Sequence, residues 1–354
     1  MDRRRFLTAV GATSGGIALS GCADDDGGPT DDTDTQDDTG ADDDGMEDGG
    51  LQMPDPYRVG ANGPSAPTWE FPAFPLFSDS LQDNHGSETE RTAFLGFSNV
   101  VSGVLSEEAE ICYLSLQAVI NARAQGLPIV AFLDNANEYT FPIVVSDAID
   151  DWDDLEGEAI AVQDTSGVSY ASTRAMVNEE LGDPEAVEYQ SMAGTENRLA
   201  ALESGEMDAA AVFTSGAFAA EAEGYGRPLA FPADYEITRN QSVLVWATLE
   251  PNVESEAEML QETVDTLLDA QEEVYERDVS SLVSDAMATD LYADFDEDVW
   301  ERSLESARES ELWSRDGEMT QEQVDRGQDL LQNAGLIAED ERVDVEDIFV
   351  DDFL

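Results

Sequence analysis

The sequence has no lysine, one histidine and two cysteines among its 354 residues. Schiff-base enzymes and P-loop nucleotide sites need a lysine amine, so both classes are excluded. The single histidine, His85, lies in a polar stretch, and we interpret it as a solvated loop residue without a metal or catalytic partner. Cys112 falls within a predicted buried strand and Cys22 near the N-terminus, so no disulfide is expected. These absences predict a chain without a catalytic residue, a metal site or a cofactor.

Basic residues are also scarce, since 16 of them face 80 acidic residues and the formal net charge is -64. All of the basic residues are arginine. Such a charge excludes nucleic acid as the expected partner, and in dilute buffer it disfavours a compact state through self-repulsion. Molar salt shortens the Debye length to about 3 Å. The composition therefore predicts a surface adapted to high salt, that is, a halophilic protein.

The N-terminus, residues 1–22, carries three arginines at 3–5, a modest apolar run, and Leu19-Ser20-Gly21-Cys22. This resembles a twin-arginine export signal that ends in a lipobox. The resemblance implies export after folding, cleavage before Cys22, and lipidation of the Cys22 sulfur at the extracellular face of the cell membrane. The alternative is an unstructured N-terminus with an accidental cysteine. Residues 23–56 are dominated by Asp, Gly and Thr and predict a disordered acidic linker.

The folded part is expected to begin with a short strand at Tyr57, followed by a turn and by the Pro-rich passage WEFPAFPLF. Proline at this density disfavours a helix, so its aromatic residues either pack on the core or line a cleft: Trp69, Phe71, Phe74 and Phe77. Farther along, the pattern predicts strands at 93–97, 111–114 and 128–133, and helices at 98–105 and 116–124.

Between Asp150 and Pro232 the pattern alternates, with strands at 159–163, 187–192 and 209–213 and helices at 168–181 and 197–202. This alternation predicts a parallel sheet. Ligands of such sheets bind outside the carboxyl ends of the strands. The three turns found there, at 164–167, 193–195 and 214–216, are small, polar and contain glycine.

The two halves can be superposed in sequence at an offset of 98, which places Val101, Val104 and Glu110 on Leu199, Leu202 and Asp208. We therefore predict two similar α/β lobes joined by two crossovers. Lobe 1 comprises residues 57–143 and 239–354, and lobe 2 comprises residues 144–238. The C-terminal third is predicted to be helical, with a capping box at Thr320 and Gln323.

Asp153-Asp154-Leu155-Glu156-Gly157 followed by AIAVQDTSG, together with LESGEMDAA at 202–210, resembles one family. It is similar to the substrate-binding proteins of ABC importers, in the group that serves sulfonates, nitrate and thiamine-type pyrimidines. The resemblance implies a type II periplasmic-binding-protein fold, capture of a small solute in the cleft, and delivery to a permease by a monomer. The family usually has a helix after its first strand, where this chain has the Pro-rich passage.

The candidate ligand residues follow predicted strands or lie on a crossover. The turn Thr165-Ser166-Gly167 opens a helix, whose N-terminus favours an anionic or electron-rich ligand group, although it could also be a plain cap. Two further candidates, Tyr139 and Phe213, could stack on a planar solute. The polar candidates that follow predicted strands are Asn62, Asn99, Ser115 and Thr214. Arg239 could pair with a sulfonate or carboxylate, or with an acidic neighbour.

Two other functions fit parts of the pattern. One is a solute receptor of the TRAP type or a receptor that signals. The other is a pyrimidine-synthesis enzyme similar to this family, which would need a histidine and a lysine that the chain does not have in place.

Overall fold

The computed structural model describes residues 51–62, 72–94, 97–289, 292 and 296–354. The twin-arginine motif, Cys22, most of the linker, Trp69 and Phe71 lie outside the described residues. Among those that are described, no helix is long and apolar enough to cross a membrane.

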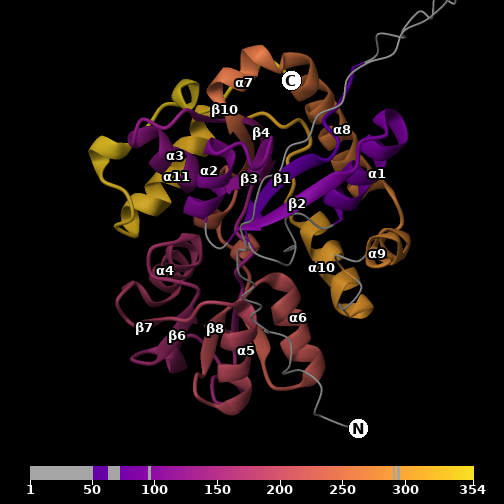
Figure 1. Ribbon diagram of the computed structural model, residues 1–354. Coiled ribbons are helices and arrows are strands. Elements are labelled where there is room, and N and C mark those ends of the chain that lie inside the picture. The colour runs from indigo at the N-terminus through magenta and orange to yellow at the C-terminus, as the bar shows by residue number, and fades with distance from the viewer. Residues whose placement is uncertain (1–50, 63–71, 95–96, 290–291, 293–295) are drawn as a thin grey trace, which may run out of the picture. The chain divides into compact units, whose positions relative to one another are not determined.

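The first sheet has the strand order β2-β1-β3-β10-β4, and β10 runs antiparallel to both of its neighbours. Its helices cover the two faces (Figure 1). Its strands are β1 (Tyr57–Asn62), β2 (Thr89–Phe94), β3 (Ile111–Ser115), β4 (Ile129–Ala136) and β10 (Leu244–Leu249). The associated helices are α1 (Ala73–His85), α2 (Phe97–Leu105), α3 (Leu116–Ala124), α7 (Glu250–Ser255), α8 (Ala257–Glu276), α9 (Val279–Met287), α10 (Glu297–Glu309) and α11 (Gln321–Asn333). We call this set of elements lobe 1.

The second sheet has the order β7-β6-β8-β5-β9. Its strands are β5 (Ile143–Val145), β6 (Ala159–Val162), β7 (Glu188–Ser191), β8 (Ala209–Ala211) and β9 (Arg227–Ala230), and its helices are α4 (Val168–Leu181), α5 (Thr195–Ser204) and α6 (Thr214–Glu223). We call this set lobe 2. The three strands from which a parallel sheet was predicted, β6, β7 and β8, do pair in parallel, whereas β5 pairs antiparallel with β8 and β9. The crossover delivers β5 into the sheet from the opposite direction.

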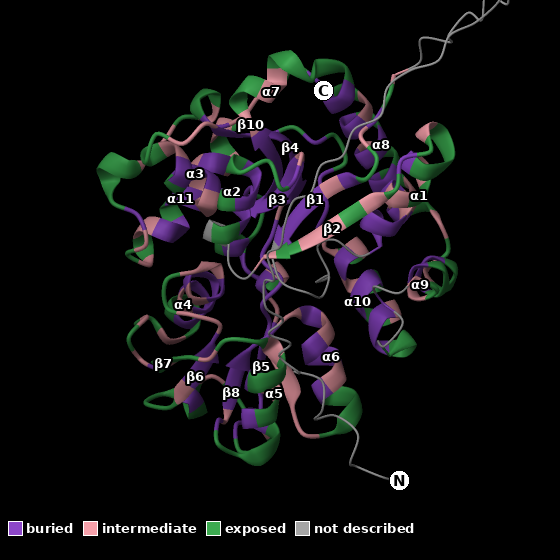
Figure 2. Cartoon of the chain, in the orientation of Figure 1, coloured by how far each residue is buried: buried purple, intermediate pink, exposed green. Residues whose placement is uncertain are grey.

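Side-chain alternation along β3 shows why the first sheet needs helices on both faces. Ile111 and Tyr113 belong to the core that includes α1 and α8, whereas Cys112 and Leu114 belong to the core that includes α2 and α3. All five residues of β3 are buried. The edge strand β2 is only partly buried, as its mixed colouring in Figure 2 shows.

The two sheets have the same strand order when β1, β2, β3, β10 and β4 are matched to β6, β7, β8, β5 and β9. When the predicted offset of 98 is added to the residue numbers, α2 falls almost on α5, and the first residue of β3 falls on the first residue of β8. This common topology agrees with the prediction of two similar lobes. Duplication of an ancestral half stays a prediction.

The Pro-rich passage was predicted to be non-helical, and this was wrong for its second half. Helix α1 begins at Ala73, directly after Pro72, and Phe74 and Phe77 are buried in the core. Pro75 lies in the first turn, where proline costs little because the backbone N–H has no intrahelical partner there. The helix that the family has after its first strand is therefore present.

Two further expectations need correction near this helix. The strand expected at 93–97 is β2, which ends at Phe94, and Phe97 already begins α2. His85 is not a solvated loop residue, because it is the last residue of α1 and its Nε2 lies 2.8 Å from Glu262 Oε1 on α8.

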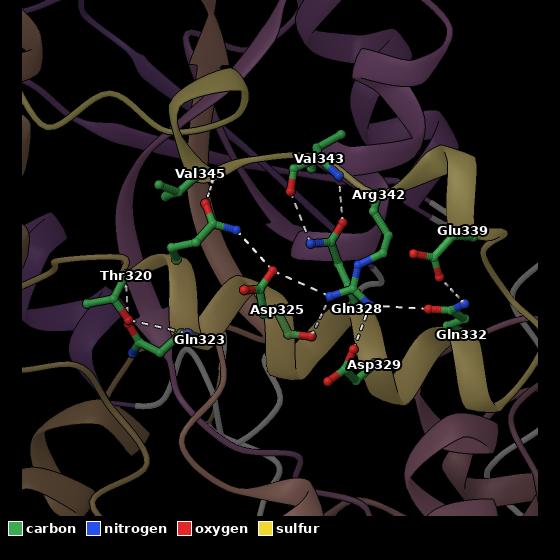
Figure 3. Close-up of polar contacts among 11 residues, drawn as sticks. Thr320, Gln323, Asp325, Gln328, Asp329, Gln332, Glu339, Arg342, Val343 and Val345 are labelled. Atoms are coloured by element: carbon green, nitrogen blue, oxygen red, sulfur yellow. Dashed lines mark hydrogen bonds and ion pairs between the residues drawn. The ribbon is translucent and has the colours of Figure 1, made fainter.

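Helix α11 holds the C-terminal segment in place through polar side chains (Figure 3). The predicted capping box is present, since Gln323 N–H donates to Thr320 Oγ1 and Thr320 N–H donates to Gln323 Oε1. Gln328 exchanges two hydrogen bonds with the backbone of Val343, of 3.1 and 2.7 Å. Arg342 pairs with Asp329 at 2.5 Å. These contacts tie α11 to residues 342–343 of the C-terminal segment.

Candidate functional site

The carboxyl ends of the strands in both lobes lead into the turns that the sequence singled out. In lobe 2 the three turns join β6 to α4, β7 to α5 and β8 to α6. In lobe 1 the residues after β1 and β2, at 63–71 and 95–96, lie outside the described residues, and β3 runs directly into α3. The lobes meet where Gln117 Nε2 of α3 lies 3.5 Å from the Ser166 carbonyl oxygen. The turn after β6 and the start of α3 therefore face each other where the lobes meet.

Ser115, at the end of β3, is buried and caps α3, because its Oγ accepts a 3.2 Å hydrogen bond from Ala118 N–H. The Leu116 N–H donates to the Val243 carbonyl oxygen over 2.9 Å, which ties this helix start to the return crossover. The cap gives Ser115 a structural role. Its contact with a solute stays a prediction.

In the turn after β6, Thr165 and Ser166 are exposed, and the Asp164 carboxylate accepts hydrogen bonds from within the turn. Ser166 donates to Asp164 Oδ1 from both its N–H and its Oγ–H, each over 2.8 Å. Gly167 precedes α4 without a side-chain cap. A side chain at this position would place a Cβ 3.0 Å from both Asp164 carboxylate oxygens, so the glycine permits their close approach. The start of α4 thus already holds a negative charge, which opposes an anion there.

Arg198 is a buried cation beneath the second and third turns, and the sequence reasoning missed it. Its guanidinium donates to the carbonyl oxygens of Ala211 and Met192 over 2.7 and 2.8 Å and to Thr195 Oγ1 over 3.2 Å. Burial lowers the pKa of Arg198 to about 10, while Glu196 and Asp164 act in the opposite direction. The side chain joins the ends of β7 and β8 and supports the cleft from below. An arginine in the first turn of a helix, where the dipole disfavours cations, was the available signal.

Three candidates from the crossover and the third turn lie together. The rings of Phe141 and Phe213 are 4.9 Å apart at 30°, and Tyr139 and Thr214 line one small cavity with Phe231. Tyr139 is 3% exposed, and burial raises the pKa of its hydroxyl. Of the rings of Tyr139, Phe141 and Phe213, that of Phe213 alone is partly exposed, and the other two belong to the core.

The remaining two lobe 1 candidates are placed only in part. Asn62 ends β1 opposite Phe94 of β2, so its backbone is at the cleft edge of the sheet. Asn99 is exposed in the first turn of α2. Whether these residues contact a solute stays a prediction, as it does for the others.

Arg239 lies elsewhere, at a cavity of about 570 Å³ beside the two crossovers. Burial raises the pKa of Glu138 to about 7, and the positive charge of Arg239 acts against this shift because it favours the charged form of Glu138. This contact fits the alternative in which Arg239 interacts with an acidic neighbour. Within the described part of the chain, no three His, Cys, Asp or Glu side chains are grouped to hold a metal ion.

Two α/β sheets of this topology, joined by two crossovers, correspond to the periplasmic-binding-protein fold. The NMT1/THI5-like family model matches residues 96–278, and the chain therefore belongs to that family. No curated protein sequence matches the chain.

Solved structures share the fold at low sequence identity. The ligand-binding component of an ABC-type import system from Staphylococcus aureus, with zinc bound, has a TM-score of 0.67 and 13% identity, over 85% of this chain and 98% of that one. The alkanesulfonate-binding protein SsuA from Xanthomonas axonopodis pv. citri, bound to MOPS, has a TM-score of 0.65 and 15% identity, over 85% and 100%. The aliphatic sulphonate binding protein SsuA from Escherichia coli has a TM-score of 0.63 and 16% identity, over 85% and 94%.

Proposed function

We propose that this protein is the solute receptor of an ABC importer. It captures a small solute between lobe 1 and lobe 2 and delivers it to a permease whose ATPase is a separate chain. The proposal rests on one observation, that the end of β3 in lobe 1 and the end of β6 in lobe 2 face each other. Gln117 of α3, just after β3, reaches Ser166 in the turn after β6. The family membership and the shared fold support it.

The N-terminal pattern supports a place for the receptor outside the cell. A twin-arginine signal would export the folded chain, and lipid on Cys22 would hold it at the membrane surface. One acyl-type anchor binds a membrane only marginally. Contact with the permease would therefore help to retain the receptor, which acts as a monomer.

The cleft chemistry favours a heteroaromatic solute over a sulfonate or nitrate. The Asp164 carboxylate lies at the helix start where an anion would otherwise bind, and it accepts two hydrogen bonds from Ser166. The half-buried ring of Phe213, which packs on the buried ring of Phe141, is the aromatic side chain that a planar solute could contact. A pyrimidine-like ring with exocyclic N–H groups could stack on an aromatic side chain and donate to a carboxylate.

A thermal-shift screen in molar NaCl, at constant ionic strength, tests the receptor function. The panel contains ethanesulfonate, nitrate, acetate, thiamine and a free aminopyrimidine. A bound solute at 100 times its Kd should stabilise the native state by about 2.7 kcal/mol and raise the Tm with concentration. We expect the pyrimidines to do so, and no response to any solute would contradict the receptor function.

The isosteric variant Asp164→Asn separates the solute classes. Asparagine keeps the oxygen that accepts from Ser166 but removes the charge. A pyrimidine that uses the carboxylate should bind at least tenfold more weakly to the variant. Tighter binding of ethanesulfonate to the variant, without any effect of pyrimidines on either protein, would establish an anion receptor instead.

A further inference from the structure

The cavity beside the crossovers is separate from the proposed cleft site. It has a volume of about 570 Å³ and lies between the start of the first crossover, the end of the second, and the loop that joins α10 to α11. Of the ligand candidates predicted from the sequence, Arg239 lines it and the others do not. Small-molecule pockets have volumes of about 300–1,000 Å³. The cavity is therefore large enough for a small solute.

The walls of this cavity are held by main-chain hydrogen bonds. Ala136 of β4 forms an antiparallel bridge with Trp313 in the loop, and Asn137 N–H donates to the Leu312 carbonyl oxygen over 2.9 Å. Gln241 N–H donates to the Asn137 carbonyl oxygen over 3.1 Å, which joins the two crossovers. A pocket framed in this way is preorganised, and a solute would not have to order it.

Two arginines that line the cavity differ from the other arginines. In a chain with 80 acidic residues, most described arginines pair with a carboxylate or donate to backbone oxygens, as Arg277 and Arg308 do. In the described part of the chain, the guanidinium groups of Arg239 and Arg315 donate no hydrogen bond to a protein group and form no ion pair. Arg315 stacks on the Tyr275 ring, with Cζ 3.8 Å from the centroid. Two guanidinium groups thus keep their donors available at one cavity.

Carboxylates line the same cavity without arginine partners. Glu311 and Glu318 are exposed, and within the described residues neither forms an ion pair. Glu311 also adopts a left-handed backbone conformation, with a φ of 54°, which is unusual for a residue with a long side chain. Glu138 accepts a hydrogen bond from Ser310 and is mostly buried. Arg326 and Glu322 of the same lining pair with each other over 3.2 Å. The cavity nevertheless keeps charges of both signs that form no ion pair within the described residues, on Arg239, Arg315, Glu311 and Glu318.

We propose that this cavity binds a small zwitterion, a molecule with a carboxylate for Arg239 and Arg315 and an ammonium group for Glu311 and Glu318. A simple anion would be repelled by the surrounding carboxylates, and a simple cation would be repelled by the guanidinium groups. A molecule that carries both charges satisfies both sets, through charge-assisted hydrogen bonds. Because both crossovers line the cavity, the zwitterion would bind where the lobes are joined.

Isothermal titration calorimetry on the mature chain, in molar NaCl at fixed ionic strength, tests this inference. The probes are three amino acids of increasing charge separation, glycine, 4-aminobutanoate and 6-aminohexanoate, with butanoate and butylammonium as the matching single-charge fragments. We expect one amino acid to bind with one-to-one stoichiometry and at least tenfold more tightly than either fragment. The absence of binding by all three, or equal binding by butanoate, would overturn the proposal.

Variants identify the site. Arg239→Gln combined with Arg315→Gln should weaken binding at least tenfold, and so should Glu311→Gln combined with Glu318→Gln. The matched control Arg277→Gln, at an arginine that pairs with Glu273 and Asp285, should bind as the unchanged chain does. Asp164→Asn, in the cleft, should also leave this affinity unchanged. Unaltered binding by both double variants, each with a normal Tm, would place the zwitterion elsewhere and refute the site.

Discussion

Two charged residues at the cleft, Asp164 and Arg198, show how single side chains change the interpretation of a turn. The sequence of the turn suggested free N–H donors at the start of α4, but Asp164 accepts from Ser166 there. Arg198 lies beneath the neighbouring turns and makes its hydrogen bonds within lobe 2. The charge of Arg198 is therefore taken up within lobe 2, whereas the Asp164 carboxylate, whose Oδ1 accepts from Ser166, is the group that the proposed solute would use.

Glu138 gives a prediction for pH dependence. Its pKa is raised from 4.5 to about 7, chiefly by burial. Between these pH values Glu138 holds a proton in the native state that it releases in the unfolded state. Its contribution to the unfolding free energy is therefore fully present below about pH 4.5 and is lost as the pH rises through 7. At about 1.4 kcal/mol per unit, the contribution is up to about 3 kcal/mol.

Glu138→Gln should remove this part of the pH dependence. We expect the decrease in unfolding free energy between pH 5 and pH 8, measured by urea denaturation, to be about 2 kcal/mol smaller in the variant. Asp134 is also buried with a raised pKa, and it remains in both proteins as an internal reference. Identical pH profiles for the two proteins would show that Glu138 does not titrate in this range.

At the scale of elements, helix α11 illustrates local and tertiary determinants acting together. Its start is written in the sequence, since Thr320 and Gln323 have the spacing of a capping box. Its position depends on contacts distant in sequence, among them Gln323 Nε2 to Asn137 Oδ1 at 3.4 Å and Arg326 to Glu236 at 3.1 Å. The helix therefore links both crossovers to the C-terminal segment.

Thr320→Ala should destabilise the protein by about 1 kcal/mol, because it leaves the Gln323 N–H at the helix start without its side-chain acceptor. Thr320→Ser keeps the hydroxyl and should restore most of the loss. Urea denaturation of both variants measures the difference. Equal unfolding free energies for the alanine and serine variants would mean that the cap contributes nothing.

At the scale of the whole molecule, the net charge of -64 dominates. Arginine pairs such as Arg58 with Glu110 and Arg342 with Asp329 neutralise only a small part of it. Self-repulsion of the remaining carboxylates opposes the compact state, and salt screens it. Adaptation to high salt stays a prediction of the composition.

Dialysis of the protein from 2 M NaCl into dilute buffer should therefore unfold it, with loss of the near-UV circular dichroism of its buried aromatic residues. Return to 2 M NaCl should restore the signal. Retention of the full signal in dilute buffer would contradict the predicted dependence on salt. An equimolar comparison with sucrose separates screening from solvent exclusion, since sucrose does not screen charge.

The sequence alone determined much of the order of elements. Helices α3 and α4 have the predicted bounds, and β3 and β6 lie within a residue of theirs, because apolar periodicity, glycine stops and polar turns are local signals. The prediction from sequence was wrong at α1. Proline disfavours a helix in its interior, but here it lies in the first turn, where it is tolerated.

Tertiary structure decided the rest. The antiparallel direction of β5 follows from how a crossover enters the sheet, and no pattern within Ile143–Val145 encodes it. The placement of Arg239 beside Glu138 and of Arg315 on the Tyr275 ring, the burial of Arg198 and the pairing of His85 with Glu262 depend on residues far away in the chain. Local sequence fixes backbone preference and burial pattern, whereas the partner of a charge is set only when distant segments pack together.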